Sequence, residues 1–210
     1  MANAKSQFVG ATGQYYVAYG LSSRWLHATI TVGNAMGVDI LCANSDGSRS
    51  MSIQVKTSSY AAKNSYGEIG FNWDVGLAAV GKFSPSLWYA FVDLLGNSKT
   101  TIPNVYFVPS KWVGMFVEKT WSRKLFYLKK SVADKITNNW EMVKRFLDGD
   151  PEVEKWATSL DPDFRWWGSK DKLTSAQLEE TLQNGGYLDE NNCIHSKTMS
   201  NSPASNATFA

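Results

Sequence analysis

The chain has 210 residues, of which 43% are hydrophobic and 13% aromatic, and its formal net charge is +2. This composition predicts a folded chain with a sizeable core and excludes a largely disordered one, and the length suits one domain with an appendage. No apolar run approaches the ~18 residues that a membrane-spanning helix requires, and the N-terminus lacks the apolar stretch of a secretion signal, so we expect a cytoplasmic protein without a membrane segment.

The cysteines and histidines give no metal-binding or disulfide pattern. Cys42 lies in an apolar run far from Cys193 in sequence, so we expect a small buried hydrophobe in a reducing compartment rather than a disulfide. Cys193 and His195 form a C-x-H pair, but His27 is the only other histidine. We therefore expect no zinc site.

The first predicted element is a helix. From about Ser6 to Leu21, apolar residues recur three and four positions apart, although Gly10 and Gly13 lower the helix propensity. The segment 25–32 becomes β-branched towards its end and is expected to form an edge strand or an extended connector.

A β-hairpin is predicted between residues 37 and 58. The apolar run 38–42 and the alternating run 51–56 are separated by the turn-forming sequence Asn-Ser-Asp-Gly at 44–47. Side chains two positions apart on a strand share a face, so Gln54 and Lys56 should point together, opposite to the core-facing residues between them.

Asp39 lies on the first strand of this hairpin. If the register places it beside Gln54 and Lys56, one face of the sheet carries a carboxylate, an amide oxygen and an ammonium group. Such a trio suits binding of a hard cation and a phosphate. The alternative is that the amide and the amine are only the solvated side of a half-buried sheet, and that Asp39 is a turn residue.

Further strands are predicted downstream. The segment 57–76 is polar with scattered aromatics and is expected to be a loop, in which Asp74 either caps a following helix or reaches a metal ion, with the cap favoured. The apolar runs 87–94 and 105–108 predict two largely buried strands. Asp93, at the end of the first, is expected to be structural or to support the site.

The order of these pieces resembles the PD-(D/E)XK nuclease superfamily, and in particular small endonuclease-like members with a Q-x-K variant of the motif. The residues that carry the resemblance are Gly13-Gln14-Tyr15-Tyr16-Val17-Ala18, Asp39, Gln54-Val55-Lys56, Trp88-Tyr89-Ala90-Phe91-Val92-Asp93-Leu94 and Val105-Tyr106-Phe107-Val108-Pro109-Ser110. They span about the first half of the chain. The resemblance implies an α/β fold with a restriction-endonuclease-like mixed central sheet flanked by helices.

The resemblance also implies the roles of individual residues. Asp39, Gln54 and Lys56 would be catalytic, and Asp39, the Gln54 side chain and the Val55 backbone carbonyl would bind Mg²⁺, for which Mn²⁺ can substitute. Gln14 matches the position of a first-helix acid that reaches the metal in many relatives. Since Gln54 and Gln14 are amides where acids are usual, Asp39 is the one carboxylate expected to bind the metal.

A basic segment is the best candidate for a DNA-facing surface. Residues 111 to 145 contain nine Lys and Arg and three acidic residues, interleaved with aromatics, a pattern that suits contact with phosphates and bases. The candidate DNA-binding residues are Arg123, Lys124, Lys129 and Lys130. The alternative is a core of aromatics beneath a solvated helix face.

The expected organisation is a nuclease-like domain over residues 1–147, a helical extension over 148–190 and a disordered tail over 191–210. The expected function is that of a metal-dependent DNA endonuclease of the restriction, homing or repair kind. A catalytically inactive DNA-binding module and a structural or interaction domain remain alternatives. Cutting both strands of a duplex often needs two sites, which would favour a homodimer.

Overall fold

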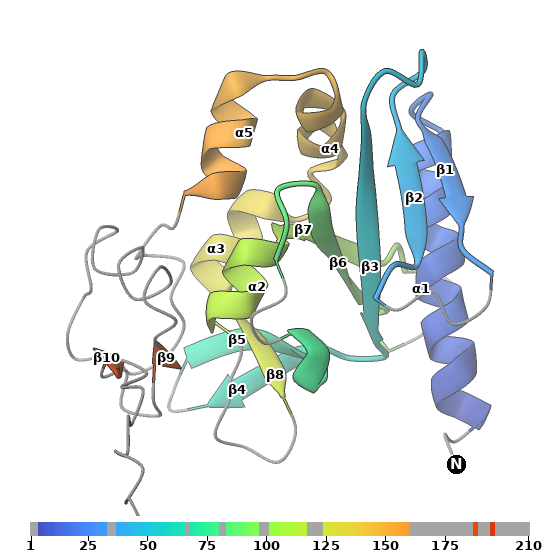
Figure 1. The fold of residues 1–210 in the computed structure, drawn as a ribbon. Coiled ribbons are helices and arrows are strands. Elements are labelled where there is room, and N and C mark those ends of the chain that lie inside the picture. Colours follow the sequence, from blue (N-terminus) through green and yellow to red (C-terminus); the bar gives the residue numbers. More distant parts are fainter. Residues whose placement is uncertain are drawn as a thin grey trace, which may run out of the picture.

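A computed structural model describes residues 4–32, 37–65, 68–79, 83–96, 101–116, 124–159, 187–188 and 194–195. Its elements are α1 (Ala4–Ser22), β1 (His27–Ile30), β2 (Ile40–Ala43), β3 (Ser50–Ser58), β4 (Ala62–Ser65), β5 (Glu68–Asp74), the 3₁₀ helix η1 (Leu77–Ala79), β6 (Leu87–Asp93), β7 (Asn104–Pro109), α2 (Ser110–Phe116), β8 (Leu125–Lys129), α3 (Lys130–Ile136), α4 (Trp140–Leu147), α5 (Pro151–Thr158), β9 (Tyr187–Leu188) and β10 (Ile194–His195). Figure 1 shows the arrangement of these elements.

The central layer is a mixed five-stranded sheet with the strand order β1-β2-β3-β6-β7. The hairpin β2–β3 is antiparallel, with Ile40 opposite Ile53, and β3 pairs in parallel with β6. The strands β1 and β7 pair antiparallel at the two edges. The expected mixed sheet flanked by helices is therefore present, and the predicted hairpin forms its centre.

The two faces of this sheet bury two separate cores, because alternate residues of β6 point to opposite sides. Trp88, Ala90 and Val92 lie in the core beneath α1, α4 and α5. Tyr89 and Phe91 lie in the core shared with β5, β8, α2 and α3. This explains why every residue of β6 is buried, as expected for a near-continuous apolar run.

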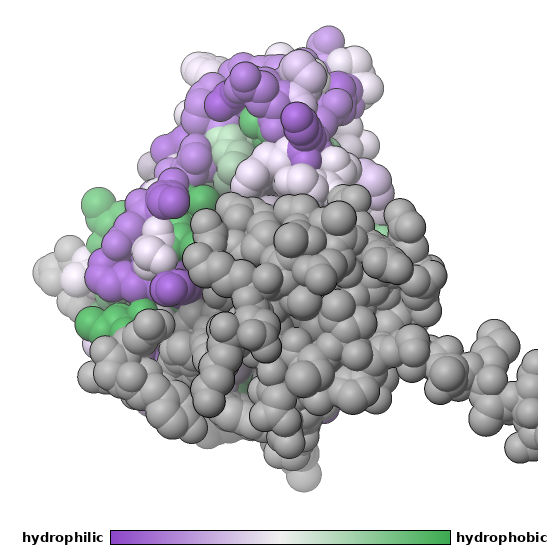
Figure 2. All heavy atoms as spheres, turned by 90° about the vertical axis from the view of Figure 1, so that its left-hand side faces the viewer, coloured by the Kyte–Doolittle hydropathy of each residue, from purple (hydrophilic) through white to green (hydrophobic). Residues whose placement is uncertain are grey.

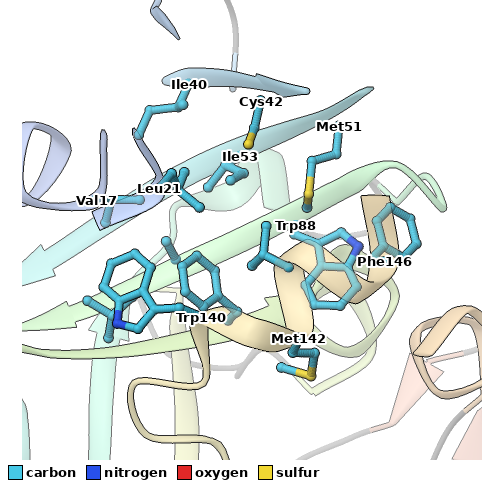
Figure 3. Packing of buried hydrophobic residues seen from close by; sticks show 14 of the residues in the cluster. Val17, Leu21, Ile40, Cys42, Met51, Ile53, Trp88, Trp140, Met142 and Phe146 are labelled. Carbon is cyan, nitrogen blue, oxygen red and sulfur yellow. The ribbon is translucent and has the colours of Figure 1, made fainter. Parts of the chain in front are cut away.

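Helix α1 packs closely against the first of these faces. Figure 3 shows Val17 and Leu21 of α1 among the side chains of β2, β3, β6 and α4. Two glycines allow the approach: a Cβ atom on Gly13 would overlap the side chain of Thr57, and one on Gly20 would overlap the ring of Trp140. Both glycines thus serve packing, and the helix forms despite their low propensity.

The segment 57–76 is not a loop, and that expectation was wrong. Strand β3 continues to Ser58, and β4 and β5 join β8 in a second, three-stranded antiparallel sheet, which lies at the lower end of β3 in Figure 1. The alternation in β5 decides this: Phe71 and Trp73 point inward, and the Trp73 ring lies 5.0 Å from that of Phe91. The glycine and the short polar residues of β5 concealed this two-residue alternation in the sequence.

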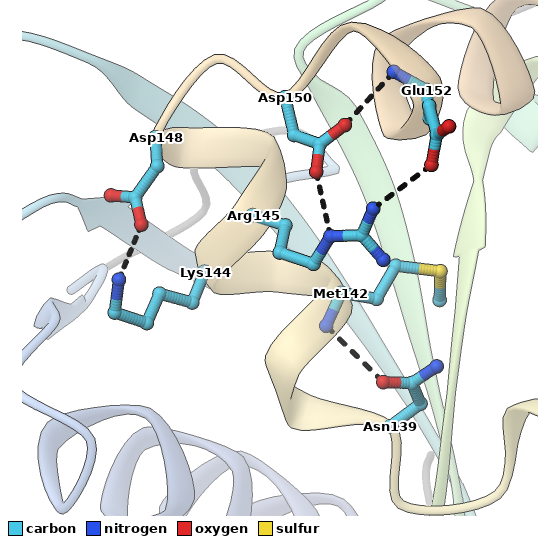
Figure 4. Close-up of polar contacts among 7 residues, drawn as sticks. All are labelled: Asn139, Met142, Lys144, Arg145, Asp148, Asp150 and Glu152. Atoms are coloured by element: carbon cyan, nitrogen blue, oxygen red, sulfur yellow. Dashed lines mark hydrogen bonds and ion pairs between the residues drawn. The ribbon is translucent and has the colours of Figure 1, made fainter.

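A polar network joins α4 to α5 (Figure 4). Asn139 caps α4 by accepting a hydrogen bond from the Met142 amide, and Asp150 caps α5 by accepting one from the Glu152 amide at 2.9 Å. The guanidinium of Arg145 binds Asp150 at 2.7 Å, which ties the end of α4 to the start of α5. The outer surface of α5 is mainly hydrophilic, as Figure 2 shows at the top of the molecule.

The structure describes only part of the C-terminal third of the chain, namely the residues up to 159 and the short strands β9 and β10. Val153 and Ala157 of α5 belong to the same core as the main sheet, and β9 and β10 form a short antiparallel pair. The rest of the expected helical extension and tail lies outside the described residues, so the domain division remains a prediction. None of the helices in the described ranges is long and apolar enough to cross a bilayer.

Cys42 and Asp93 are both buried. Cys42 is an unpaired thiol inside the first core, as expected, and burial raises its pKa to about 12. Asp93 is fully buried at the end of β6, where its Oδ1 accepts hydrogen bonds from the amides of Leu95 at 3.0 Å and Ala61 at 3.1 Å. Asp93 therefore has a structural role, holding the chain that leaves β3 against the chain that leaves β6.

The Asp93→Asn variant should be more stable than the wild type at neutral pH. Burial raises the pKa of Asp93, so the protonated carboxyl is favoured in the folded state and stability falls as pH rises through the folded-state pKa. Asparagine keeps an oxygen for both amides and removes the charge. Chemical unfolding across pH should show the advantage shrinking in acid; an advantage that is constant with pH would contradict this account.

The Gly20→Ala variant should be destabilised, because the added methyl group would push against the Trp140 ring. Overpacking of this kind costs about 1–3 kcal/mol in free energy of unfolding. Gly10→Ala is the matched control on the same helix, since its Cβ would meet nothing within 4 Å. It should gain up to about 1 kcal/mol from helix propensity, and equal effects of the two variants in urea unfolding would refute the packing role of Gly20.

Candidate active site

The Asp39 carboxylate is held on the backbone of β3. Asp39 lies just before β2, and its amide donates to the Ile53 carbonyl at 2.9 Å. Its Oδ2 accepts a hydrogen bond from the Val55 amide at 2.7 Å. The Asp39 carboxylate thus accepts the hydrogen bond that a backbone carbonyl of a longer β2 would accept from Val55. It contacts the β3 backbone between Gln54 and Lys56.

Gln14 of α1 provides the second contact to this carboxylate. Its Nε2 donates to the Oδ1 of Asp39 at 3.0 Å. The close packing of α1 on β3 at Gly13 and Thr57 brings the amide within reach. The resemblance offered Gln14 as one possible metal ligand, and here its amide nitrogen donates to Asp39.

Gln54 and Lys56 lie on the face of β3 that belongs to the second core. In the parallel pairing with β6 they are opposite Tyr89 and Phe91. Both side chains are half-buried. Neither makes a hydrogen bond or an ion pair with another residue in the described ranges, so their polar ends remain available to a ligand.

Two carboxylates act on the charge of Lys56. Burial lowers the pKa of the Lys56 ammonium, while the negative charge of Asp39 and then that of Asp74 raise it. Asp74 ends β5, and its Oδ1 accepts a hydrogen bond from the Gly76 amide at 3.2 Å, in the turn before η1. The favoured cap of a helix beginning near Val75 is not present, because η1 begins only at Leu77 and the bond from Gly76 closes a turn before it. The electrostatic proximity of Asp74 to Lys56 was missed, because β5 was read as part of a loop.

The oxygen atoms of this site suit a hard divalent cation. Each Asp39 oxygen accepts one hydrogen bond and retains a further lone pair. The Gln54 amide can supply a neutral oxygen ligand, and Mg²⁺ commonly keeps several waters beside one or two carboxylates. Within the described ranges there is no group of three His, Cys, Asp or Glu residues that could bind a metal. Asp39 is the carboxylate held on the β3 backbone between Gln54 and Lys56.

The predicted basic residues are separated by the fold. Lys124 precedes β8, and its carbonyl accepts the Val75 amide, which places it beside the end of β5 that carries Asp74. Lys129 lies at the opposite end of β8, where it pairs with Gly70. Lys130 forms an exposed ion pair with Asp134 at 2.7 Å. Arg123 lies outside the described residues.

Comparison with known proteins adds one structural likeness. No family model and no curated protein sequence matches the chain. Among solved structures, the bacterial homing endonuclease I-Ssp6803I aligns with a TM-score of 0.47 and 12% sequence identity, over 73% of this chain and 99% of that one. The function proposed below rests on the site residues and not on this likeness.

Proposed function

We propose that the chain is a metal-dependent DNA endonuclease whose reactive site is formed by Asp39, Gln54 and Lys56. The observation that carries the proposal is the position of the Asp39 carboxylate, hydrogen-bonded to the β3 backbone between the other two residues. An anion, a neutral oxygen and a cation would then face one common site, in the order of the Q-x-K form of the PD-(D/E)XK motif that the sequence resembles.

Phosphodiester hydrolysis requires an activated water and relief of the negative charge that grows on the phosphoryl oxygens. When bound, Mg²⁺ or Mn²⁺ would supply both through its positive charge. Asp39 and the Gln54 amide oxygen would hold the ion, with the Val55 carbonyl as a further ligand. Lys56 would hold the attacking water and stabilise the charge of the transition state, a preorganised electrostatic role.

The single carboxylate favours a second candidate function, that of a DNA-binding module that does not cut. An amide in place of an acid removes one negative charge from the site, which lowers its affinity for a cation. If the ion does not bind even with DNA present, the same surface would hold a phosphate through Lys56 alone. Salt-sensitive DNA binding without metal-dependent cleavage would identify this function.

Purified protein should nick or cut plasmid DNA when Mg²⁺ or Mn²⁺ is present, and Asp39→Asn and Lys56→Ala should each lower the cleavage rate by about 100-fold or more. Asp39→Asn removes the charge but keeps an oxygen for hydrogen bonding, so folding should survive. Lys135→Ala changes an exposed lysine of α3 and is the control. Equal cleavage rates in the wild type and the three variants would rule out this active site. If the protein does not bind DNA at all, a structural or interaction domain would be the remaining interpretation.

The Gln54→Glu variant should bind Mg²⁺ or Mn²⁺ more tightly in a calorimetric titration without DNA. One added charge near the ion contributes about 1 kcal/mol even in full contact with water, and more at the half-buried Gln54, so the affinity should rise roughly fivefold or more. Gln7→Glu adds the same charge to the exposed start of α1 and is the matched control. An affinity unchanged by Gln54→Glu, or raised equally by both variants, would show that Gln54 is not a ligand.

A further inference from the structure

The outer side of α1 is unusually apolar for a helix at the edge of a protein. Val17 and Leu21 bury its inner side against the sheet. On the opposite side, Phe8, Tyr15 and Tyr19 are exposed at 75%, 69% and 70%. Three large aromatic rings in water on one helix form a patch that neither core of the described structure uses.

These residues form a straight line along the helix. At 3.6 residues per turn, positions 8, 15 and 19 fall within about 40° of one another around the helix axis. Small residues continue the line at the spacing of a coiled-coil seam. We call the set the α1 seam: Ala4, Phe8, Ala11, Tyr15, Tyr19 and Ser22.

The α1 seam carries no charge. The one charged residue of α1 is Lys5, in the first turn. Arg24 follows the helix, but its guanidinium donates to the Gly20 carbonyl at 2.7 Å and lies 4.9 Å from the centroid of the Trp140 ring, on the inner side. A neutral surface of this kind matches another neutral, aromatic surface and does not repel a copy of itself.

We propose that the chain forms a two-fold symmetric dimer in which the α1 seams of two copies pack against each other. Aromatic side chains have about 150–250 Å² of surface each, so the exposed parts of the three rings in two copies would bury roughly 800 Å². The rest of a helix face about 28 Å long brings the buried area towards the ~1,200 Å² at the lower end of specific interfaces. The area suits a reversible dimer.

The sizes of the seam residues complement each other in an antiparallel pair. A two-fold axis near position 13 sets Tyr15 of one copy against Ala11 of the other, and Phe8 against Ala18, a half-buried residue beside the seam. Large side chains then meet small ones, which is the condition for close helix packing. An isologous contact of this type closes after two copies and leaves no seam exposed.

The dimer would have a direct consequence for the candidate site. Gln14, which binds Asp39, lies on the same helix but off the seam. Pairing through α1 would therefore set two Asp39 sites at a fixed separation without covering Gln14. Cleavage of both strands of a duplex often needs two sites, although the dimer itself does not depend on the nuclease function.

The test is sedimentation of the full chain without DNA or metal, over a wide range of concentrations. The wild type should be dimeric at high concentration. The double variants Y15E/Y19E and Y15K/Y19K should each raise the dimer Kd by about tenfold or more, because they bury like charges. An equal mixture of the two should form heterodimers, which only a seam-to-seam contact explains.

Ile102→Glu is the matched control, because Ile102 is 74% exposed but lies outside α1, and it should leave the dimer intact. A wild type that stays monomeric at every concentration would overturn the proposal; residues 160–210 or another partner would then be the occupant of the seam. A dimer that survives in both double variants, or a mixture that remains monomeric, would overturn it as well. Loss of nuclease activity in other experiments has no bearing on these outcomes.

Discussion

The hydrogen bond from the Val55 amide to the Asp39 carboxylate is the constraint on which the site depends. Strand β2 begins at Ile40, whereas β3 continues to Ser58, so the Val55 amide lies beyond the last residue of β2 that could pair with it. An amide left unpaired there would cost about 1–3 kcal/mol. Asp39 supplies the missing acceptor, and this hydrogen bond holds its carboxylate beside the β3 backbone.

Much of this framework follows from local sequence patterns. The alternation in Met51 to Lys56 predicts which side chains of β3 face the core, and the all-apolar run of β6 predicts a strand buried on both faces. Both depend only on the two-residue period of a strand. The same period places Gln54 and Lys56 on one face of β3, whereas Asp39 was picked out through the resemblance to the PD-(D/E)XK pattern.

Other parts of the site depend on contacts that no local pattern encodes. The reach of Gln14 to Asp39 spans 25 residues and depends on how closely α1 packs, which Gly13 permits. The second sheet was missed because Gly70 and the polar residues around it conceal the inward alternation of Phe71 and Trp73. Because the second sheet was missed, the position of Asp74 was missed too. Its charge acts on Lys56 only because β5 packs across the end of β3.

In the function we propose, the charges of the site imply that the metal and the nucleic acid would bind together. Asp39 contributes one negative charge and the neighbouring Lys56 one positive charge, while Asp74 adds a negative charge that also acts on Lys56. The unliganded site therefore has only a weak net attraction for a cation. A phosphate adds negative charge where the cation would lie, and each ligand therefore raises the affinity for the other, as linkage requires. In this arrangement Gln14 has a purpose that a carboxylate at the same position would not serve, since its amide donates a hydrogen bond to Asp39 Oδ1, which a second carboxylate would repel.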